Sequence, residues 1–325
     1  TGTSRSTGRR SEPVDVSDVV ISEFMGAGAV RSLADDFDVR YDPTLVDDRE
    51  AILDAVSDAR ALIVRNRTQV DAELLAAAPD LRVVGRLGVG LDNIDVTACE
   101  ARRVAVRPAT GANADAVAEY VVAAVLVLVR GVFAATPQVA AGEWPREASK
   151  GREVAGRRVG LVGFGDIARR VADRLAALGM EVAAHDPYLP VDDPAWASAE
   201  RCDLDELLAS SDAISVHVPL VDETRHLIDA EAIATMPTGA VVVNTSRGGI
   251  VDEQAVVDAL VRGHLGGAAL DVFETEPLVG AAAERLADVP NLILTPHVAG
   301  ITEESVGRVG AMTADQVRAV LRAQS

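Results

Sequence analysis

The sequence predicts an α/β protein that contains two doubly wound parallel sheets. Short apolar runs alternate with amphipathic stretches along the chain, which is the rhythm of β-α-β units. The runs are uniformly apolar, as is typical of parallel strands that helices cover on both faces. The length of 325 residues favours two domains of ordinary size over one small module.

The first series of alternating segments fills the chain up to about residue 110. The strands expected there are VVISEF (19–24), ALIVRN (61–66) and RVVGRLG (82–88). RPATGA (107–112) predicts a loop, and the apolar pattern over about 115–130 predicts a long helix. The mixed segment 136–156 predicts an excursion between two units.

The second series begins at Arg158 and closes with a helix over about 303–322. Its expected strands are RVGLVGFG (158–165), EVAAHD (181–186), AISVHVP (213–219), AVVVNTS (240–246), GAALDVF (267–273) and NLILTPH (291–297). Ligands of doubly wound sheets bind beyond the carboxyl ends of the strands, so polar residues that end these strands are expected to meet in one crevice. They are Gly163, Asp186, His217, Thr245, Ser246, Arg247, Asp271 and His297.

A glycine pattern follows the first strand of this series. Gly163 to Ala168 reads G-x-G-x-x-A, in which the glycines allow a tight turn and a close approach of the backbone to a pyrophosphate. The helix that begins there offers N–H groups to the phosphates. Asp186, 23 residues after Gly163, can accept hydrogen bonds from ribose hydroxyls and repels a 2′-phosphate. The unit therefore predicts NAD as the cofactor. Gly88, Val89 and Gly90 lack such a context, and predict a tight loop that binds an anion.

Three residues predict the chemistry. Arg247 can hold a carboxylate bidentately and polarise a neighbouring carbonyl. His297 has the side chain best suited to proton exchange near neutral pH, and Glu276 can orient it and hold it protonated. This set is typical of proton and hydride transfer on a carboxylate substrate.

Composition excludes several classes of protein. A net charge of −19 disfavours nucleic-acid binding, which depends on Lys and Arg. Cys99 and Cys202 lie far apart and outside any CxxC pair, so no disulfide framework and no metal site are expected. The apolar run 120–129 is too short for a membrane span. Residues 1–18 lack the apolar core of a secretory signal, so a flexible tail and a cytoplasmic protein are expected.

Seven segments resemble the D-isomer-specific 2-hydroxyacid dehydrogenase family in letters, order and spacing, over nearly the whole chain. They are GRLGVGLDNID (85–95), GANADAVAEY (111–120), VGLVGFGDIARRVA (159–172), HVPLVDETRHLI (217–228), VVNTSRGGIVDE (242–253), ALDVFETEPL (269–278) and TPHVAG (295–300). The resemblance implies two Rossmann-like lobes, with a NAD-binding lobe (111–295) inserted into a flavodoxin-like substrate lobe (19–110 and 296–325). It also implies a homodimer formed through the inserted lobe.

The resemblance assigns a role to each site residue. Arg247 binds the substrate, His297 is the acid/base and Glu276 pairs with it, while the N–H groups of Val89 and Gly90 bind the substrate carboxylate. In reduction, hydride passes from NADH to C2 of a 2-oxo acid as His297 protonates the alkoxide. The residues expected to contact NAD are Gly163, Phe164, Gly165, Asp166, Ile167, Asp186, His217, Val218, Pro219, Thr224, Thr245, Ser246, Arg247, Asp271, His297 and Gly300.

The substrate lobe indicates the kind of 2-hydroxy acid. Arg65, Arg67 and Arg86 stand at strand ends in an acidic protein, which predicts that they bind a second anionic group on the substrate, with surface ion pairing as the alternative. Segments 64–68 (VRNRT) and 85–93 resemble the phosphoglycerate dehydrogenase branch. Segments 21–25 (ISEFM), 41–47 (YDPTLVD) and 64–70 (VRNRTQV) are similar to bacterial sulfolactate dehydrogenases, whose substrate carries a sulfonate. Glyoxylate or hydroxypyruvate reduction stays open.

Other relatives are disfavoured. Formate dehydrogenases carry glutamine where Glu276 stands, and phosphite dehydrogenases use a substrate-loop lysine, whereas the lysine of this chain is Lys150. Long phosphoglycerate dehydrogenases have a regulatory domain after the final helix, which is not expected in a chain that ends at Ser325. The C-terminal binding protein corepressors also resemble the family, so an NAD(H)-sensing binding protein is the alternative of another class, which turnover of 2-oxo acids would separate from an enzyme.

Overall fold

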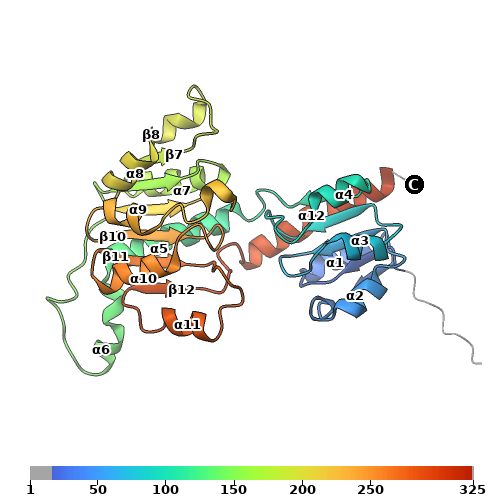
Figure 1. The fold of residues 1–325 in the computed structure, drawn as a ribbon, viewed down its shortest axis with the longest axis horizontal. Helices are drawn as coiled ribbons and strands as arrows, with labels where there is room; N and C mark the ends of the chain where they lie inside the picture. The colour runs from blue at the N-terminus through green and yellow to red at the C-terminus, as the bar shows by residue number, and fades with distance from the viewer. Residues whose placement is uncertain (1–16, 324–325) are drawn as a thin grey trace, which may run out of the picture. The chain divides into compact units, whose positions relative to one another are not determined.

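A computed structural model describes residues 17–323, which form two compact units (Figure 1). The first unit contains the described residues up to Thr110 and those from Val306 onward, and the second contains Gly111–Ser305. Most of the predicted tail, residues 1–16, lies outside the described residues. Its last two residues belong to the first unit, since Ser17 is buried and Asp18 forms an ion pair with Arg60 at 3.1 Å.

The first unit has a five-stranded parallel sheet in the order β2-β1-β3-β4-β5. This is the flavodoxin-like order that the family resemblance implies. Its strands are β1 (Val19–Ile21), β2 (Val39–Tyr41), β3 (Ala61–Val64), β4 (Val83–Arg86) and β5 (Ala105–Pro108). The fully buried strands β1, β3 and β4 are the predicted ones. The prediction of a loop over 107–112 is wrong at its start, because Arg107 and Pro108 belong to the edge strand β5.

Aspartate side chains begin three of the helices around this sheet. Asp48, Asp71 and Asp95 each accept a hydrogen bond from an N–H group in the first turn of the helix that follows. Apolar residues of these helices pack into one core with the strands. The helices of the unit are α1 (Ala27–Ala34), α2 (Arg49–Ala55), α3 (Ala72–Ala77), α4 (Val96–Ala101) and most of α12 (Glu303–Ala323), with a short 3₁₀ turn η1 (Leu45–Asp47).

The second unit has a seven-stranded parallel sheet in the order β12-β11-β10-β9-β6-β7-β8. The chain moves from β6 to one edge through β7 and β8, and then returns to β9 and moves to the other edge. This reversal between β6 and β9 is the switch point at which doubly wound sheets bind ligands. The strands are β6 (Arg158–Val162), β7 (Glu181–His185), β8 (Glu200–Arg201), β9 (Ala213–Val216), β10 (Ala240–Asn244), β11 (Leu265–Leu270) and β12 (Leu292–Leu294). The predicted fold class, α/β with two parallel sheets, is confirmed.

Helices cover both faces of this sheet (Figure 1). One core forms between the sheet and the helices α5 (Ala114–Arg130) and α7 (Asp166–Ala177). The core on the opposite face contains apolar residues of α8 (Leu204–Ser210), α9 (Ala230–Thr235) and α10 (Glu253–Val261). The remaining elements are α6 (Thr136–Ala140), α11 (Ala281–Leu286) and the 3₁₀ turns η2 (Val132–Ala135), η3 (Pro194–Ser198) and η4 (Asp222–Thr224).

The two units join at Gly111 and again within α12. The sequence places the second join at residue 296, whereas the compact second unit extends to Ser305. The reason is local: the N–H of His297 donates to the carbonyl of Asp271 at 2.8 Å, and the Ser305 hydroxyl donates to the carbonyl of Gly300 at 2.8 Å.

No single helix within residues 17–323 is both long and apolar enough to cross a membrane. Helix α5 meets the length and composition together with residues 132–140, to which it is joined at a bend of 66°. Nine residues of α5 are buried in the second unit, so the helix serves as a core element there.

Candidate active site

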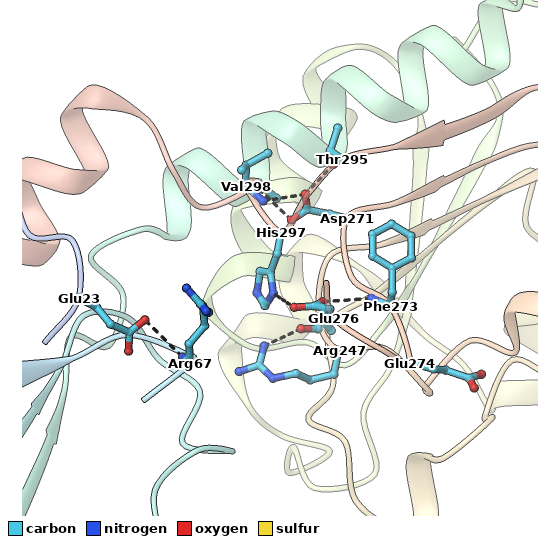
Figure 2. A network of polar contacts seen from close by, with 12 residues as sticks. Glu23, Arg67, Arg247, Asp271, Phe273, Glu274, Glu276, Thr295, His297 and Val298 are labelled. Carbon is cyan, nitrogen blue, oxygen red and sulfur yellow. Dashed lines mark hydrogen bonds and ion pairs between the residues drawn. The ribbon is translucent and has the colours of Figure 1, made fainter. Parts of the chain in front are cut away.

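The polar residues that end the strands of the second unit lie along one edge of its sheet. Because all these strands are parallel, their carboxyl ends face the same way. Gly163 directly follows β6, His217 follows β9 and Asp271 follows β11. Figure 2 shows the part of this edge around Asp271 and His297.

Gly163 has a backbone that only glycine accommodates well. Its φ is +86°, and a Cβ atom would lie 2.7 Å from the carbonyl oxygen of His217. Gly165, which caps α7, has no atom within 4 Å of where a Cβ would stand, and it provides no side-chain cap. The first N–H groups of α7 are therefore left for an external acceptor. This cradle fits the pyrophosphate of NAD.

Asp186, the residue expected to bind the ribose, shapes this glycine loop. One carboxylate oxygen accepts the N–H of Phe164 at 2.9 Å, and the other accepts the N–H groups of Tyr188 and Leu189 at 3.0 and 3.2 Å. A carboxylate has about four acceptor positions, so one remains for a ribose hydroxyl. The arrangement fits the unphosphorylated ribose of NAD.

Several residues that the resemblance places at the cofactor have buried or internally bonded side chains. Phe164 is buried and stacks on Trp196 with ring centroids 5.3 Å apart, and Ile167 packs in the core under α7. Asp166 bonds Arg170 at 3.1 Å. These side chains therefore pack in the core or form an ion pair within α7.

The segment after β9 is held by an internal hydrogen bond and by a contact with the core. The Thr224 hydroxyl donates to the carbonyl of Pro219 at 2.6 Å, and Val218 packs against the core. Within residues 17–323, the buried Nε2 of His217 has no hydrogen-bond partner. Burial lowers the pKa of His217 to about 4, so its imidazole is neutral at pH 7.

His297 and Glu276 form a close pair (Figure 2). Nδ1 of His297 lies 2.8 Å from one carboxylate oxygen of Glu276, and the other oxygen accepts the N–H of Phe273 at 3.1 Å. Burial raises the pKa of Glu276, but the hydrogen bond from His297, the N–H of Phe273 and the charge of Arg247 together bring it below its ordinary value. Glu276 is therefore a carboxylate that accepts a hydrogen bond from the Nδ1–H of His297, which leaves Nε2 outside this pair.

Arg247 stands in a loop that hydrogen bonds shape on both sides. The side-chain N–H of Asn244 donates to the carbonyl of Arg247 at 2.9 Å, and the Ser246 hydroxyl donates to the carbonyl of Val216 at 2.7 Å. Thr245 lies between them, half-buried. Gly248 follows, and a Cβ atom there would lie 1.9 Å from the carbonyl oxygen of Phe273. The Arg247 loop and the loop that carries Glu276 therefore touch through their backbones.

The Asp271 carboxylate is engaged in hydrogen bonds with the segment 295–299. Its carboxylate accepts hydrogen bonds from the Thr295 hydroxyl at 2.6 Å and from the N–H groups of Val298 and Ala299, both at 2.8 Å. Gly300 follows in the same turn, where a Cβ atom would lie 2.4 Å from the side-chain nitrogen of Asn113. Asp271 thus holds the segment that carries His297.

In the first unit, Glu23 fixes the conformation of the loop that carries Arg65. Its carboxylate accepts the N–H groups of Arg65 and Thr68 at 2.8 and 3.0 Å. The Arg65 guanidinium lies 5.9 Å from the centre of the Phe24 ring, and burial lowers its pKa although the charge of Glu23 opposes this. Within residues 17–323 no carboxylate forms an ion pair with Arg65, whereas neighbouring Arg67 pairs with Asp47.

Arg86 and the Gly88 loop lie together in this unit. Arg86 is 8% exposed and donates to the carbonyl of Leu87 at 3.0 Å. Gly88 has φ +144°, and Arg86 fills the space where a Cβ atom would stand. Val89 is 41% exposed, so the loop presents its tip to solvent while Arg86 lies beneath it. This geometry places Arg86 as a support of the loop.

The sequence analysis did not identify the residues that hydrogen-bond to Glu274, in the loop that carries Glu276. Buried Glu253 accepts the N–H of Glu274 at 2.7 Å, and burial raises the pKa of Glu253. Nε2 of His226 lies 3.0 Å from the Glu274 carboxylate. A glutamate at the start of an otherwise apolar helix, as in VDEQAVV (251–257), is the signal that could have indicated a buried acceptor.

The cysteines are free and buried. Cys202 lies with Glu200 and Glu206 at distances that would suit a metal ion, but Arg158 pairs with Glu200 at 2.9 Å and bonds the Cys202 sulfur at 3.1 Å. Arg158 therefore neutralises one of the two carboxylates in this cluster.

Known proteins share this sequence and architecture. The profile of the family described as D-isomer specific 2-hydroxyacid dehydrogenase, NAD binding domain, matches residues 122–299. The chain is 56% identical to the (S)-sulfolactate dehydrogenase of Chromohalobacter salexigens, over 94% of this chain and 99% of that protein. It is 44% identical to the D-3-phosphoglycerate dehydrogenase of Mycobacterium tuberculosis over 93% of this chain, and spans 56% of that longer protein.

A solved structure of similar fold is that of D-lactate dehydrogenase from Aquifex aeolicus, complexed with NAD and lactic acid. It superposes with a TM-score of 0.82 at 28% identity and covers 94% of this chain and 96% of that one. Together with the match to a NAD binding domain, this likeness confirms the predicted cofactor.

Proposed function

Since the chain belongs to the D-isomer specific 2-hydroxyacid dehydrogenase family and is NAD-dependent, we propose that its substrate is a 2-hydroxy acid of the sulfolactate type. The observation that carries this proposal is the 56% identity to a sulfolactate dehydrogenase over 94% of this chain and 99% of that protein. Such a substrate has a carboxylate at one end and a second anion, a sulfonate, at the other. Its 2-oxo partner is sulfopyruvate.

The glycine loop after β6 and Asp186 would hold NAD, which would supply a hydride acceptor for C2 in oxidation and, as NADH, a hydride donor in reduction. We propose that Arg247 binds the substrate carboxylate and polarises the C2 oxygen. His297 takes the hydroxyl proton on Nε2 in oxidation and donates it in reduction, and the Glu276 carboxylate stabilises the imidazolium in both directions. General acid–base catalysis of this kind contributes about 10²–10⁴-fold to the rate.

The first unit supplies the remaining contacts in this proposal. The N–H groups of Val89 and Gly90 bind the carboxylate, and Arg86 supports their loop from below. Arg65 binds the sulfonate, because its guanidinium is partly desolvated and forms no ion pair with a carboxylate within residues 17–323.

The expected hand of the substrate agrees with the family. In D-lactate the carboxylate outranks the methyl group, so the D form is R. In sulfolactate the sulfur-bearing carbon outranks the carboxylate, so the same spatial arrangement is named S. The (S) in the name of the similar enzyme therefore describes the hand that a D-specific site accepts.

Replacing Arg65 by alanine tests the substrate assignment. We expect kcat/KM for sulfopyruvate to exceed that for glyoxylate, hydroxypyruvate and phosphohydroxypyruvate. The Arg65→Ala change is expected to lower kcat/KM for sulfopyruvate by about 10- to 100-fold, because it removes a hydrogen bond to a charged group. Glyoxylate reduction, which involves no second anion, is expected to change little. NADH oxidation with each 2-oxo acid measures all these values.

Arg67→Ala is the matched control, since Arg67 lies in the same loop but already pairs with Asp47. It should leave the preference for sulfopyruvate intact. Preference for glyoxylate or hydroxypyruvate, indifferent to Arg65, would contradict the proposal and indicate a general 2-oxo acid reductase. Preference for phosphohydroxypyruvate would replace the sulfonate by a phosphate. NADH binding without turnover of any of the four would favour the sensing role.

We also propose that the enzyme is a cytoplasmic homodimer that pairs through the segment after α5. Phe133 and Trp144 in this segment are 61% and 76% exposed, which is unusual for large aromatic side chains and typical of an interface. The cytoplasmic assignment rests on the use of NAD and on the free cysteines. Light scattering should give twice the chain mass of 33.9 kDa, and Trp144→Glu should shift it toward a single chain. A monomeric wild type would contradict this proposal.

A further inference from the structure

His297 has an unusual backbone for a residue with a large side chain. Its φ is +55°, in the left-handed region that costs free energy for residues other than glycine. The surrounding turn must therefore be held by specific contacts. The N–H of His297 donates to the carbonyl of Asp271, and the next two N–H groups donate to the Asp271 carboxylate, all at 2.8 Å.

Asp271 is in turn oriented by a chain of hydroxyl groups. The Thr295 hydroxyl donates to the Asp271 carboxylate at 2.6 Å, and the Tyr120 hydroxyl lies 2.7 Å from the Thr295 oxygen. Thr295 has one hydroxyl proton, and the carboxylate needs it. Tyr120 must therefore be the donor to Thr295, which gives a chain with a single direction from Tyr120 through Thr295 to Asp271.

Tyr120 is suited to anchor such a chain. It lies in α5, a helix of 17 residues whose apolar face is buried in the core of the second unit. Burial and the charge of Asp271 together raise the pKa of Tyr120, despite the opposing hydrogen bond with Thr295, so the hydroxyl keeps its proton at neutral pH and stays a donor. The Tyr120 hydroxyl connects this rigid helix to the turn of His297 across 175 positions of sequence.

We infer that Tyr120 is a positioning residue for the reaction. By fixing Thr295 and Asp271 it holds the His297 turn so that Nδ1 faces Glu276 and Nε2 stays directed toward the reacting oxygen. Tyr120 itself contacts neither substrate nor cofactor in this role. The inference rests on the proposed role of His297 as the acid/base.

The test is a set of single-atom-scale changes measured by steady-state kinetics. Tyr120→Phe removes only the hydroxyl, Thr295→Val removes the next one, and Thr295→Ser keeps it. We expect kcat for 2-oxo acid reduction to fall about ten-fold in Tyr120→Phe and in Thr295→Val, with the KM for NADH unchanged, because the catalytic group is displaced while the binding groups remain. Thr295→Ser should retain most of kcat, and Tyr120→Phe with Thr295→Val should lose little more than either alone.

Tyr41→Phe is the matched control, since Tyr41 lies on the edge strand β2 of the first unit, and its kcat should equal that of the wild type. A Tyr120→Phe enzyme whose kcat stays within two-fold of the wild type would overturn the inference, as would a rise in the KM for NADH at constant kcat. So would strict additivity of the two changes. Loss of activity in Tyr120→Phe together with full activity in His297→Asn would instead refute the proposed role of His297.

Discussion

Replacing His297 by asparagine is expected to lower kcat/KM by about 10²–10⁴-fold, because the substitution removes the group that exchanges a proton with the C2 oxygen. Asparagine is the suitable replacement, since it adopts the left-handed backbone of His297, with φ +55°, more readily than other residues. The turn held by Asp271 should then persist. Steady-state kinetics in both directions measures the loss.

The dependence on pH gives a second measurement. Reduction takes up one proton and oxidation releases one, so a rise in pH should favour oxidation over reduction. His217 adds nothing to this dependence above about pH 6, because burial lowers its pKa to about 4. His297→Asn should lower kcat/KM in both directions, while its affinity for NADH, measured by fluorescence titration, should remain. A His297→Asn variant with wild-type kcat would rule out His297 as the acid/base.

Fully buried strands are the parts of the fold that sequence predicts most readily. Strands β3 and β4 are buried along their whole length, so their apolar runs stand out. Strands β2 and β5 are missed because they form the edges of the first sheet and are only partly buried. Strand β8, at an edge of the second sheet, has two exposed residues, Glu200 and Arg201. Such edge strands are defined by pairing with a neighbour, which composition does not encode.

The site shows the same division between local and distant causes. The glycines around Phe164, and the residues that end strands, are local features, and sequence predicts where they lie. The hydrogen bonds that hold them join residues far apart: Tyr120 to Thr295, and Glu253 to Glu274. These partners depend on how the helices dock on the sheet, so single residues give no signal of them. The family resemblance therefore predicts the roles of the site residues, whereas their supporting hydrogen bonds are seen only in the structure.

Replacing Gly248 by alanine is expected to cause the other large effect, although it alters no reacting group. A Cβ atom at this position would lie 1.9 Å from the carbonyl oxygen and 2.0 Å from the carbonyl carbon of Phe273, and 2.5 Å from the N–H nitrogen of Glu274. These are backbone atoms, so no change of rotamer can relieve the overlap. Either the Arg247 loop or the Glu276 loop must move.

Both loops carry proposed catalytic residues, so a movement of either should separate groups that act together. We expect Gly248→Ala to lower kcat/KM by at least about 100-fold and the free energy of unfolding by about 1–3 kcal/mol. Gly28→Ala is the control, since Gly28 lies in α1 with no atom within 4 Å of the new Cβ, and alanine there should favour the helix without affecting activity. Kinetics and urea denaturation measure the two effects. Full activity in Gly248→Ala would mean that the loops yield without moving Arg247 or Glu276, and that the close backbone contact is not what holds the pair in place.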